Sequence, residues 1–515
     1  MTSNHFNKAA DDTDWNWQTV FTKKDIPFTA TPGPSDTARN CFTPEDFFSL
    51  FFSDSVIDTL VLETNRYAEQ SRSAKPSNMP WDPVSASQMK AFLGLHIAMG
   101  VSDLPEIHDY WSVEPALQMP WYQSVMARDL FTQILRYLHC CNAQAAKPRP
   151  DYDKLFKIRD VVTSISQSCS QHYTPEQHIS IDEQMIGTRC RVSFIQYMPN
   201  KPQRFGIKVW ALADSKNGYL SNFQVYTGKE PGTAEVGLSY RVVYDLMQPY
   251  LNKGYKLYTD NFYTSPKLVK DLLNDGTYLT GTVRANRRGF PKDLVGAKLD
   301  RYGAEFKHSN GITAVHWKDK RDVYCLSSLH GSEMDVCPGS GDGSEQKTKP
   351  RLICDYNAHM GGVDLHDQLQ VYYSIGRKGI KWWRKVFWRM LEISVLNSYV
   401  LYCCVHGRSR KMTQKNYRLQ LAYSLVSIYV DQQANPPDNT VVSGPGRRPS
   451  PIPRLLGKHF PSNLHIRGRC RVCAKHKNPL TGKYKDTKTV TYCDKCEVHL
   501  CIGDCFAIYH TRATM

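Results

Sequence analysis

The stretch Ile179-Ser180-Ile181-Asp182-Glu183 marks a change in the character of this 515-residue chain. It predicts a short strand, because apolar and polar residues alternate along it. Two further strands are predicted at residues 205–213 and 219–226, and the turn-forming residues 214–218 join them. Together these segments predict a three-stranded antiparallel unit.

The residues that follow extend this unit into a mixed α/β core. Helices are predicted at residues 236–250 and 265–273, and strands at residues 256–260 and 278–283. Residues 285–351 differ, because strand-forming runs in their middle lead into a Gly- and Ser-rich loop. We therefore expect an α/β fold whose core is interrupted by a β-rich insertion.

Helical sequence flanks the core on both sides. From Thr43 to about Gln171 apolar residues recur at helical spacing, and Thr43-Pro44-Glu45-Asp46 is typical of a helix start. Helical patterns return after the core, before a Pro-rich stretch. The predicted segments are, in order, a flexible N-terminal arm (1–40), the first part of a helical domain (41–176), the first part of the core (177–284), the insertion (285–351), the last core helix (352–371), the second part of the helical domain (372–432), a Pro-rich linker (433–454) and a cysteine-rich segment (455–515).

The composition is that of a globular protein, but its charge is unevenly distributed. With 41% hydrophobic and 22% charged residues, wholesale disorder is excluded, and no apolar run reaches the ~18 residues that span a bilayer. The formal charge of +16 is concentrated in residues 372–415 and 440–515. Such basic regions on an otherwise near-neutral chain predict polyanion binding, although a basic surface kept for solubility is the alternative. We expect a soluble, intracellular protein with no membrane partner.

Three acids stand where a strand–strand–helix site would place them. Asp182 lies on the first strand, Asp260 ends a later strand, and Asp364 opens a helix after the insertion. Asp364 and Asp367 share a helix face, while Asp182 and Glu183 face opposite ways on a strand. Clustered carboxylates favour Mg²⁺ or Mn²⁺, and a pair of such ions supports phosphodiester chemistry. The alternative is that each aspartate is a helix cap or turn residue.

Several short motifs occur in the order seen in piggyBac transposases, and the chain resembles the vertebrate piggyBac-derived group from about Thr43 to its C-terminus. These motifs are Ser180-Ile181-Asp182-Glu183-Gln184-Met185, Pro199-Asn200-Lys201-Pro202, Gly206-Ile207-Lys208, Thr259-Asp260-Asn261-Phe262-Tyr263-Thr264-Ser265, Gly281-Thr282-Val283-Arg284, Gly361-Gly362-Val363-Asp364 and Asp367-Gln368. The resemblance implies a ribonuclease-H-like catalytic core with an insertion domain. It also implies a helical dimerisation and DNA-binding domain around that core and a C-terminal zinc domain.

The resemblance also implies a site and a reaction. Asp182, Asp260 and Asp364 match the family's catalytic metal-binding triad, and Asp367 matches a further acid beside it. The implied reaction is cut-and-paste transposition. Water hydrolyses one strand at each transposon end, the freed 3′-hydroxyl forms a hairpin on the TTAA overhang, and the opened end attacks a target TTAA. The implied partners are double-stranded DNA, with its terminal repeats and TTAA target, and a second copy of the chain.

Four residues match DNA-contacting positions of the family. Arg284 matches an arginine near the DNA strands, and Arg287 occupies the neighbouring basic position. Lys381-Trp382 matches a basic–tryptophan pair near the target bases, where the ring would stack on an unpaired base. For Trp382 a place in the protein core is an equal alternative, because other aromatic residues lie nearby on the same predicted helix.

The C-terminal segment carries a zinc-binding pattern. Its candidate ligands are Cys470, Cys473, Cys493, Cys496, Cys501, Cys505 and His510. Cysteine pairs two residues apart suit a tetrahedral Zn²⁺, and seven ligands indicate two ions, in a cross-braced arrangement with an eighth ligand to be found. The candidates for that ligand are His459, His476 and His499, and the family pattern favours His459.

Three functions compete on these observations. The first is a catalytically competent DNA transposase, because all four family acids are present. The second is a domesticated, transposase-derived DNA-binding protein without cleavage activity, and the third is a chromatin reader built on the zinc module. Because DNA is the implied substrate and short basic clusters occur near residues 408–411 and 447–448, we expect a nuclear protein.

Overall fold

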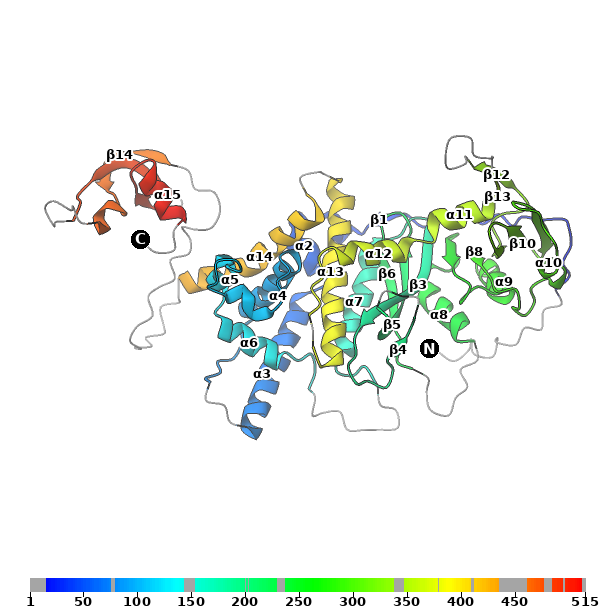
Figure 1. Cartoon of the computed structure of the whole chain (residues 1–515), viewed down its shortest axis with the longest axis horizontal. Coiled ribbons are helices and arrows are strands. Elements are labelled where there is room, and N and C mark those ends of the chain that lie inside the picture. The colour runs from blue at the N-terminus through cyan, green and yellow to red at the C-terminus, as the bar shows by residue number, and fades with distance from the viewer. Residues whose placement is uncertain are drawn as a thin grey trace. The chain divides into compact units, whose positions relative to one another are not determined.

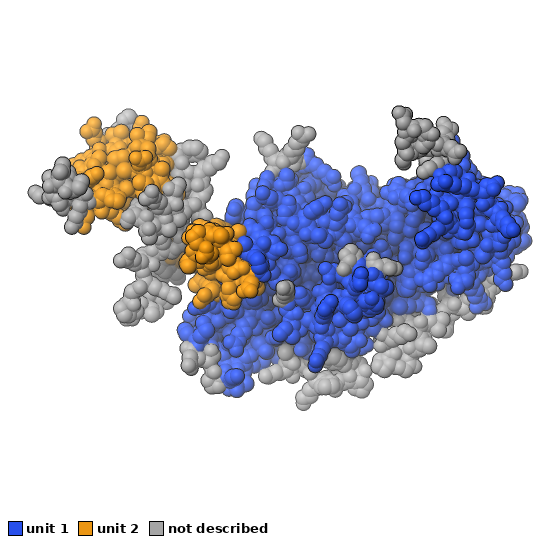
Figure 2. Space-filling model, viewed as in Figure 1, with its two compact units in different colours: residues 1–105, 129–427 blue, residues 106–128, 428–515 orange. Residues whose placement is uncertain are grey.

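Figure 1 shows a computed structural model of the chain. It divides into two compact units, which are coloured in Figure 2: residues 1–105 with 129–427, and residues 106–128 with 428–515. The described residues are 15–75, 79–142, 153–199, 201, 203–228, 237–337, 347–377, 379–408, 412–434, 461–476, 484–493 and 496–511.

The first unit is built on one nine-stranded mixed sheet. Its order is β4-β5-β3-β7-β8-β11-β10-β9, and β6 lies beside β5. The first strands of the core are antiparallel, as the sequence predicted, while β7 lies parallel to both β3 and β8. The strands of the sheet are β3 (His178–Gly187), β4 (Gln196–Tyr197), β5 (Phe205–Asp214), β6 (Leu220–Val225), β7 (Lys256–Thr259), β8 (Tyr278–Thr282), β9 (Ala304–Ser309), β10 (Ile312–Lys318) and β11 (Asp322–Ser327).

A continuous hydrophobic core joins this sheet to the helices α8 (Leu238–Met247) and α9 (Pro266–Asn274). Ile181 of β3 and Leu257 of β7 are fully buried in it, together with Leu268 of α9. Both helices were predicted from their apolar spacing, and Ser265 caps α9 by accepting a hydrogen bond from the Leu268 amide.

The strands of the predicted insertion continue the core sheet. β11 pairs with β8 in antiparallel register, Leu326 opposite Gly281, and β10 and β9 follow at the edge. Among the described strands of the insertion, β12 (Met334–Cys337) and β13 (Lys347–Pro350) alone form a separate two-stranded antiparallel sheet. The inserted chain therefore shares backbone hydrogen bonds with the core.

The N-terminal residues that the structure describes pack on the core, in contrast to the expected flexible arm. Trp17 donates from Nε1 to the carbonyl of Gly289 at 3.0 Å, and the Ile26 amide donates to the Tyr278 hydroxyl at 2.6 Å. β1 (Gly33–Pro34) pairs with β2 (Tyr173–Thr174). The physical reason is burial, since apolar side chains of this segment cover the core.

The helical region comes from both sides of the core in sequence. In Figure 1 the long helix α13 (Trp382–His406) stands between the sheet and the helices α3 and α4 of the first unit. Asn397 of α13 fastens it to β6, because its side chain accepts from the Leu220 amide at 3.0 Å and donates to the Leu220 carbonyl at 2.9 Å. At the start of the helical region in sequence, Thr43 and Asp46 form the predicted capping box of α2.

The first unit contains further helices besides those already named. They are α1 (Asp36–Arg39), α2 (Pro44–Ser49), α3 (Asp54–Ala74), α4 (Ala86–Val101), α6 (Arg128–Tyr137), α7 (Arg159–His172), η3 (Gln248–Tyr250), α10 (Lys292–Val295), α11 (Arg351–His359), α12 (Gly362–Val371) and α14 (Gln414–Ala434), with the ends of α6 and α14 reaching residues of the second unit.

The second unit contains two small helices and the cysteine-rich segment. The helices are η2 (Ile107–Trp111) and α5 (Pro120–Val125). The cysteine-rich segment forms a three-stranded antiparallel sheet followed by one helix: β14 (Ser462–Arg469), β15 (Lys488–Cys493), β16 (Val498–His499), η5 (Cys473–Lys475) and α15 (Asp504–Thr511). Across the described parts of both units, every helix is too short or too polar to cross a bilayer.

Candidate active site and metal centres

Strand register places Asp182 beside Asp260. β3 and β7 run parallel, and Ile181 pairs with Thr259. Asp182 and Asp260 are the next residues on their respective chains, so they occupy equivalent positions on neighbouring strands. Adjacent strands lie about 4.8 Å apart, and the two carboxyl groups are therefore neighbours although 78 residues separate them in sequence.

Helix α12 lies along the same face of β3. The side chains of Ser180, Asp182 and Gln184 lie on that face, because every second residue of a strand points to the same side. A Cβ at Gly362 would come within 2.7 Å of the Ser180 Oγ, so only glycine allows the helix start to approach this closely. Three residues after Asp364, Asp367 accepts at Oδ1 from Gln184 Nε2 at 2.8 Å. Asp364 lies between Gly362 and Asp367 on α12, and the β3 residues that these two contact, Ser180 and Gln184, lie on either side of Asp182.

These acids are neighbours, but they do not form a closed ligand shell. The groups of ligating side chains that converge within 4.8 Å among the described residues do not include Asp182, Asp260 and Asp364 together. Carboxylates without a cation between them repel one another. Glu183 follows Asp182 on the opposite face of β3, where it accepts from the Tyr263 hydroxyl at 3.2 Å and lies 3.7 Å from Lys208 Nζ, and its charge still contributes to the raised pKa of Asp182 and of Asp260.

Burial disfavours the ionised form of two carboxyl groups in this site. It raises the pKa of Asp182 to about 7, and it also raises the pKa of Asp260. One cation approaches Asp182: Lys201 Nζ lies 3.7 Å from its Oδ2 and donates to the Glu183 carbonyl at 3.0 Å. Hard oxygen donors of this kind fit a divalent cation such as Mg²⁺ or Mn²⁺, which would favour their ionised form.

The two side chains that donate hydrogen bonds to Asp367 were not predicted from the sequence. Arg389 of α13 donates to Asp367 Oδ1 at 2.7 Å, and its side chain is only 6% exposed. Gln184 is the second. Its position two residues after Asp182 on a strand was a usable signal, whereas nothing in the sequence connects Arg389 to α12.

The two predicted DNA-contacting arginines lie on the loop after β8. Arg287 is half-buried, and it donates to the carbonyls of Asn261 at 2.8 Å and Phe262 at 2.5 Å. Arg284 is exposed, and its Nε donates to Asn261 Oδ1 at 3.3 Å. Arg287 therefore supports the loop that follows Asp260, while Arg284 presents its charge to solvent.

Lys381 and Trp382 lie where α13 begins. Lys381 Nζ is 5.2 Å from the centre of the Tyr67 ring, and burial followed by repulsion from Arg384 lowers its pKa to about 8. Trp382 is half-buried, with its ring edge-to-face against Phe194 at 5.3 Å. The neighbouring Trp383 is only 3% exposed and belongs to the core.

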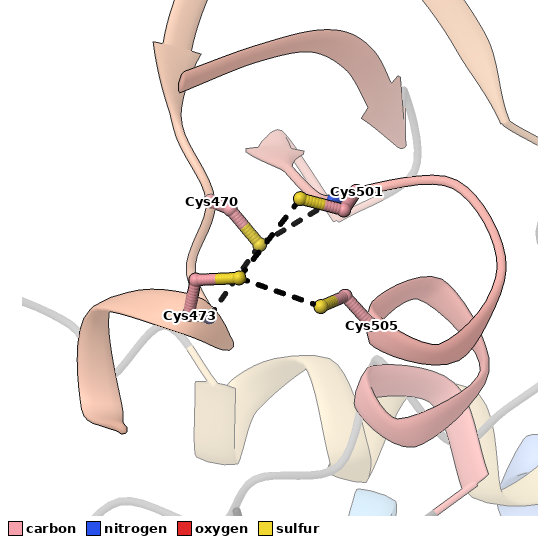
Figure 3. Close-up of side chains that lie close together, drawn as sticks. All are labelled: Cys470, Cys473, Cys501 and Cys505. Carbon is pink, nitrogen blue, oxygen red and sulfur yellow. Dashed lines mark hydrogen bonds between the residues drawn. The ribbon is translucent and has the colours of Figure 1, made fainter. Parts of the chain in front are cut away.

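The cysteines converge on two centres. Figure 3 shows Cys470 and Cys473 facing Cys501 and Cys505, and Cys473 Sγ lies 3.6 Å from the Sγ of Cys505. The second group is Cys493, Cys496 and His510, in which Cys496 Sγ lies 3.5 Å from His510 Nε2. The groups interleave in sequence, so the predicted cross-braced arrangement describes this segment.

The sulfur environment suits a bound cation. Cys470 Sγ accepts from the backbone amides of Cys473 at 3.5 Å and Cys501 at 3.4 Å. Burial alone would raise the pKa of Cys470, but these amides outweigh it and lower the pKa to about 7. The donor set is compatible with a zinc domain. Among the described residues neither His476 nor His499 joins the three-membered group, and His459 lies outside them.

Comparison with known proteins agrees with this architecture. A family model described as "Transposase IS4" matches residues 43–399. The human PiggyBac transposable element-derived protein 3 is 27% identical over 500 residues, which are 94% of this chain and 78% of that protein. The human PiggyBac transposable element-derived protein 2 is 26% identical over 480 residues, covering 88% and 77%.

A solved structure matches nearly the whole chain. It is the cryo-EM structure of a piggyBac transposase synaptic complex with hairpin DNA, with a TM-score of 0.70 and 26% identity over 92% of this chain and 98% of that one. A model match over more than half the chain, two relatives aligned over most of their length and a common fold lead to one conclusion: this chain belongs to the piggyBac transposase family.

Proposed function

We propose that this chain is an active DNA transposase that excises and integrates DNA at TTAA sites. The observation that carries the proposal is the parallel register of β3 and β7, which sets Asp182 beside Asp260 under the helix that bears Asp364 and Asp367. Membership of a transposase family supports DNA cleavage in general, and this constellation supports it for this chain.

The side chains of the site would have two roles in the reaction, metal binding and positioning. Asp182, Asp260 and Asp364 would hold divalent cations, Mg²⁺ or Mn²⁺, which when bound lower the pKa of an attacking water or 3′-hydroxyl and stabilise the leaving oxygen. Asp367 is held by Gln184 and Arg389 and keeps α12 in place against β3. Arg287 holds the loop after Asp260. The attack of water, the hairpin-forming attack of the 3′-hydroxyl and the final strand transfer would share this one site.

Double-stranded DNA is the proposed partner, because the structural relative is a transposase on hairpin DNA. Arg284, Lys381 and Trp382 are the proposed contacts in the first unit. In the cysteine-rich segment, which we propose binds two Zn²⁺ ions, Arg467 and Arg471 are exposed and are the proposed phosphate contacts, while the exposed Arg469 pairs with Asp486 at 3.0 Å.

We further propose a homodimer and a nuclear location. Two transposon ends are cut and joined in one event, which requires at least two active sites. Light scattering with and without end DNA tests the dimer, and a monomer under both conditions would contradict it. Imaging of a fluorescently tagged chain tests the location, and retention in the cytoplasm would contradict it.

The cleavage test uses purified protein, Mg²⁺ and labelled DNA that ends in the flanking repeat and TTAA. A denaturing gel is expected to show a nick and then a hairpin-sized product. Asp260→Ala removes one ligand and is expected to abolish both products, whereas Asp58→Asn, an exposed acid on α3, leaves them unchanged. Binding of the correct repeat without cleavage would contradict an active transposase and support a domesticated DNA-binding protein.

A further inference from the structure

A hydroxyl group extends the row of acids in the candidate active site. β3 pairs with β7 in parallel register, which sets Asp182 beside Asp260. β7 pairs with β8 in parallel register as well, with Thr259 opposite Gly281. Thr282 follows Gly281 in the chain, so it lies beside Asp260 just as Asp260 lies beside Asp182. Three neighbouring strands therefore bring two carboxyl groups and one hydroxyl group to equivalent positions.

The side chain of Thr282 lies on the side of the sheet that bears α11. Residues in register on paired strands point to the same side, and Thr282 pairs with Cys325 of β11. The Cys325 side chain is buried in one cluster with Leu352 and Ile353 of α11. The next residue, Val283, belongs to the core on the opposite side, with α8 and α9. Thr282 therefore faces the helices that cover the acids.

Tyr356 of α11 brings a second hydroxyl group to this row. Burial raises the pKa of its hydroxyl, a hydrogen bond with Thr282 acts in the opposite direction, and the charges of Asp260 and Asp182 raise the pKa further. The hydroxyl thus contacts Thr282 and lies close enough to both acids to interact with their charge. Thr282 and Tyr356 are both half-buried, so substrate can reach them from solvent.

The turn of α11 that carries Tyr356 is anchored to the sheet. The adjacent Asp355 accepts at Oδ2 from the hydroxyl of Tyr258, on β7, at 2.7 Å. The rings of His178, which begins β3, and His359, which ends α11, stack with their centres 3.8 Å apart. These contacts join α11 to the two strands that position Asp182 and Asp260. The place of the Tyr356 hydroxyl is therefore set by the fold before any substrate binds.

Neutral donors at this place suit a phosphate beside bound cations. Two hydroxyl groups carry two protons, and their mutual hydrogen bond uses one, so the pair retains one donor for a further acceptor. An uncharged donor can bind a phosphate oxygen without competing with a divalent cation for the acids, as a nearby ammonium group would. The exposed Arg284, a proposed DNA contact, follows Thr282 by only two residues. A DNA backbone held by Arg284 therefore passes close to the hydroxyl pair.

We propose that Thr282 and Tyr356 contact the scissile phosphate and donate a hydrogen bond to one of its non-bridging oxygens. The inference rests on the proposed function, because it takes DNA as the substrate of the acid site. The pair orients the phosphate beside Asp182 and Asp260, and it stabilises the negative charge that develops on the phosphate oxygens during attack.

Binding of two DNAs to the full chain in Ca²⁺ tests this contact apart from cleavage. Both DNAs carry the flanking repeat and TTAA; one strand is continuous in the first, and in the second it is nicked and lacks the scissile phosphate. Thr282→Val and Tyr356→Phe are each expected to bind the continuous DNA about 3- to 10-fold more weakly than the wild type, and the nicked DNA equally well. Thr282→Ser keeps the hydroxyl and is expected to recover most of the affinity. Tyr423→Phe, at an exposed position of α14, is the control.

Equal weakening on both DNAs, or no weakening on either, would overturn the proposal. The Mn²⁺ affinity of the DNA-free variants is expected to match that of the wild type, because the hydroxyls bind phosphate and not the cation. Weaker Mn²⁺ binding would make the hydroxyls part of the metal site and would also overturn it.

Cleavage separates this proposal from the proposed function. With Mg²⁺ and continuous DNA, each hydroxyl deletion is expected to slow cleavage by about 10- to 100-fold, because a hydrogen bond to a charged oxygen is lost. Cleavage at the wild-type rate by both Thr282→Val and Tyr356→Phe would overturn the phosphate contact and leave the transposase standing. If the variants weaken binding as expected but the wild type never cleaves, the result would contradict an active transposase and still support the phosphate contact.

Discussion

Arg389 of α13 donates to Asp367 Oδ1 at 2.7 Å, and Gln184 of β3 donates to the same oxygen at 2.8 Å. One acid of the site is thus clamped between a helix of the flanking region and a strand of the core. The charge of Asp367 is compensated by protein, whereas Asp182 has Lys201 at 3.7 Å and a pKa near 7. The two acids therefore differ in how their charge is compensated: Asp367 is paired with Arg389, whereas under the proposed function a divalent cation would compensate Asp182.

Arg389→Ala is expected to slow strand cleavage by about 10- to 100-fold, the usual cost of removing a group that orients a metal-site residue. Binding of end DNA is expected to stay unchanged, because the buried Arg389 offers little surface to DNA. Cleavage rates and a binding titration on the same preparation measure the two effects. Arg389→Lys keeps the charge and should recover part of the rate; equal loss of binding and cleavage would contradict a positioning role.

Asp182→Asn is expected to lower cleavage by at least about 100-fold, because the amide cannot supply the anionic oxygen that a divalent cation needs. Glu183→Gln is the matched control. Its side chain faces Tyr263 and Lys208 on the other side of β3, so only a small decrease is expected. Gel assays at saturating Mg²⁺ compare the variants, and similar losses in both would assign the chemistry to the wrong side of the strand.

Lys201→Gln is expected to tighten Mn²⁺ binding by about three- to tenfold, because the ammonium near Asp182 competes electrostatically with the metal. Titration of the DNA-free protein, followed by the electron paramagnetic resonance signal of free Mn²⁺, gives the affinity. Lys216→Gln changes an exposed lysine paired with Glu176 and serves as the control. Weaker Mn²⁺ binding in Lys201→Gln would mean that Lys201 positions the acids for the metal and does not compete with the metal for Asp182.

Glu392 is expected to make the stability of the first unit depend on pH. Burial raises the pKa of this carboxyl to about 7, although Arg418 at 3.6 Å acts in the opposite direction. The folded pKa is above the unfolded value, so the folded state binds the extra proton. The contribution of Glu392 is complete below about pH 4 and is lost as the pH rises through 7.

Glu392→Gln removes this titration. The free energy of unfolding of the wild type, minus that of the variant, is therefore expected to fall between pH 5 and pH 8, by at most about 1.4 kcal/mol per pH unit. Urea unfolding at several pH values measures the difference. A difference that stays constant, or rises with pH, would show that Glu392 is ionised in the folded protein at low pH.

Much of the local structure followed from the sequence. Alternating residues predicted β3, and Thr43 with Asp46 predicted the start of α2, because strand pleat and helix capping depend on neighbours within four residues. The cysteine spacing likewise predicted a cross-braced segment. The sequence left open which cysteines share an ion, because that depends on how β15 and α15 fold back onto the first pair.

Other relationships exist only in the folded chain. The insertion strands joined the core sheet through β11 and β8, and Trp17 and Ile26 packed on the core where a flexible arm was expected. Backbone pairing and burial between distant segments leave no signal in local periodicity.

The sequence by itself determined the family motifs, the order of strands and helices, and the candidate acids and cysteines, since each is a property of residue type and short spacing. Only the tertiary structure decided that Arg389 reaches Asp367, that Arg287 holds the loop after Asp260, and that His178 meets His359. The reason is physical: packing of remote elements, not spacing along the chain, brings these charges and lone pairs within a few ångströms.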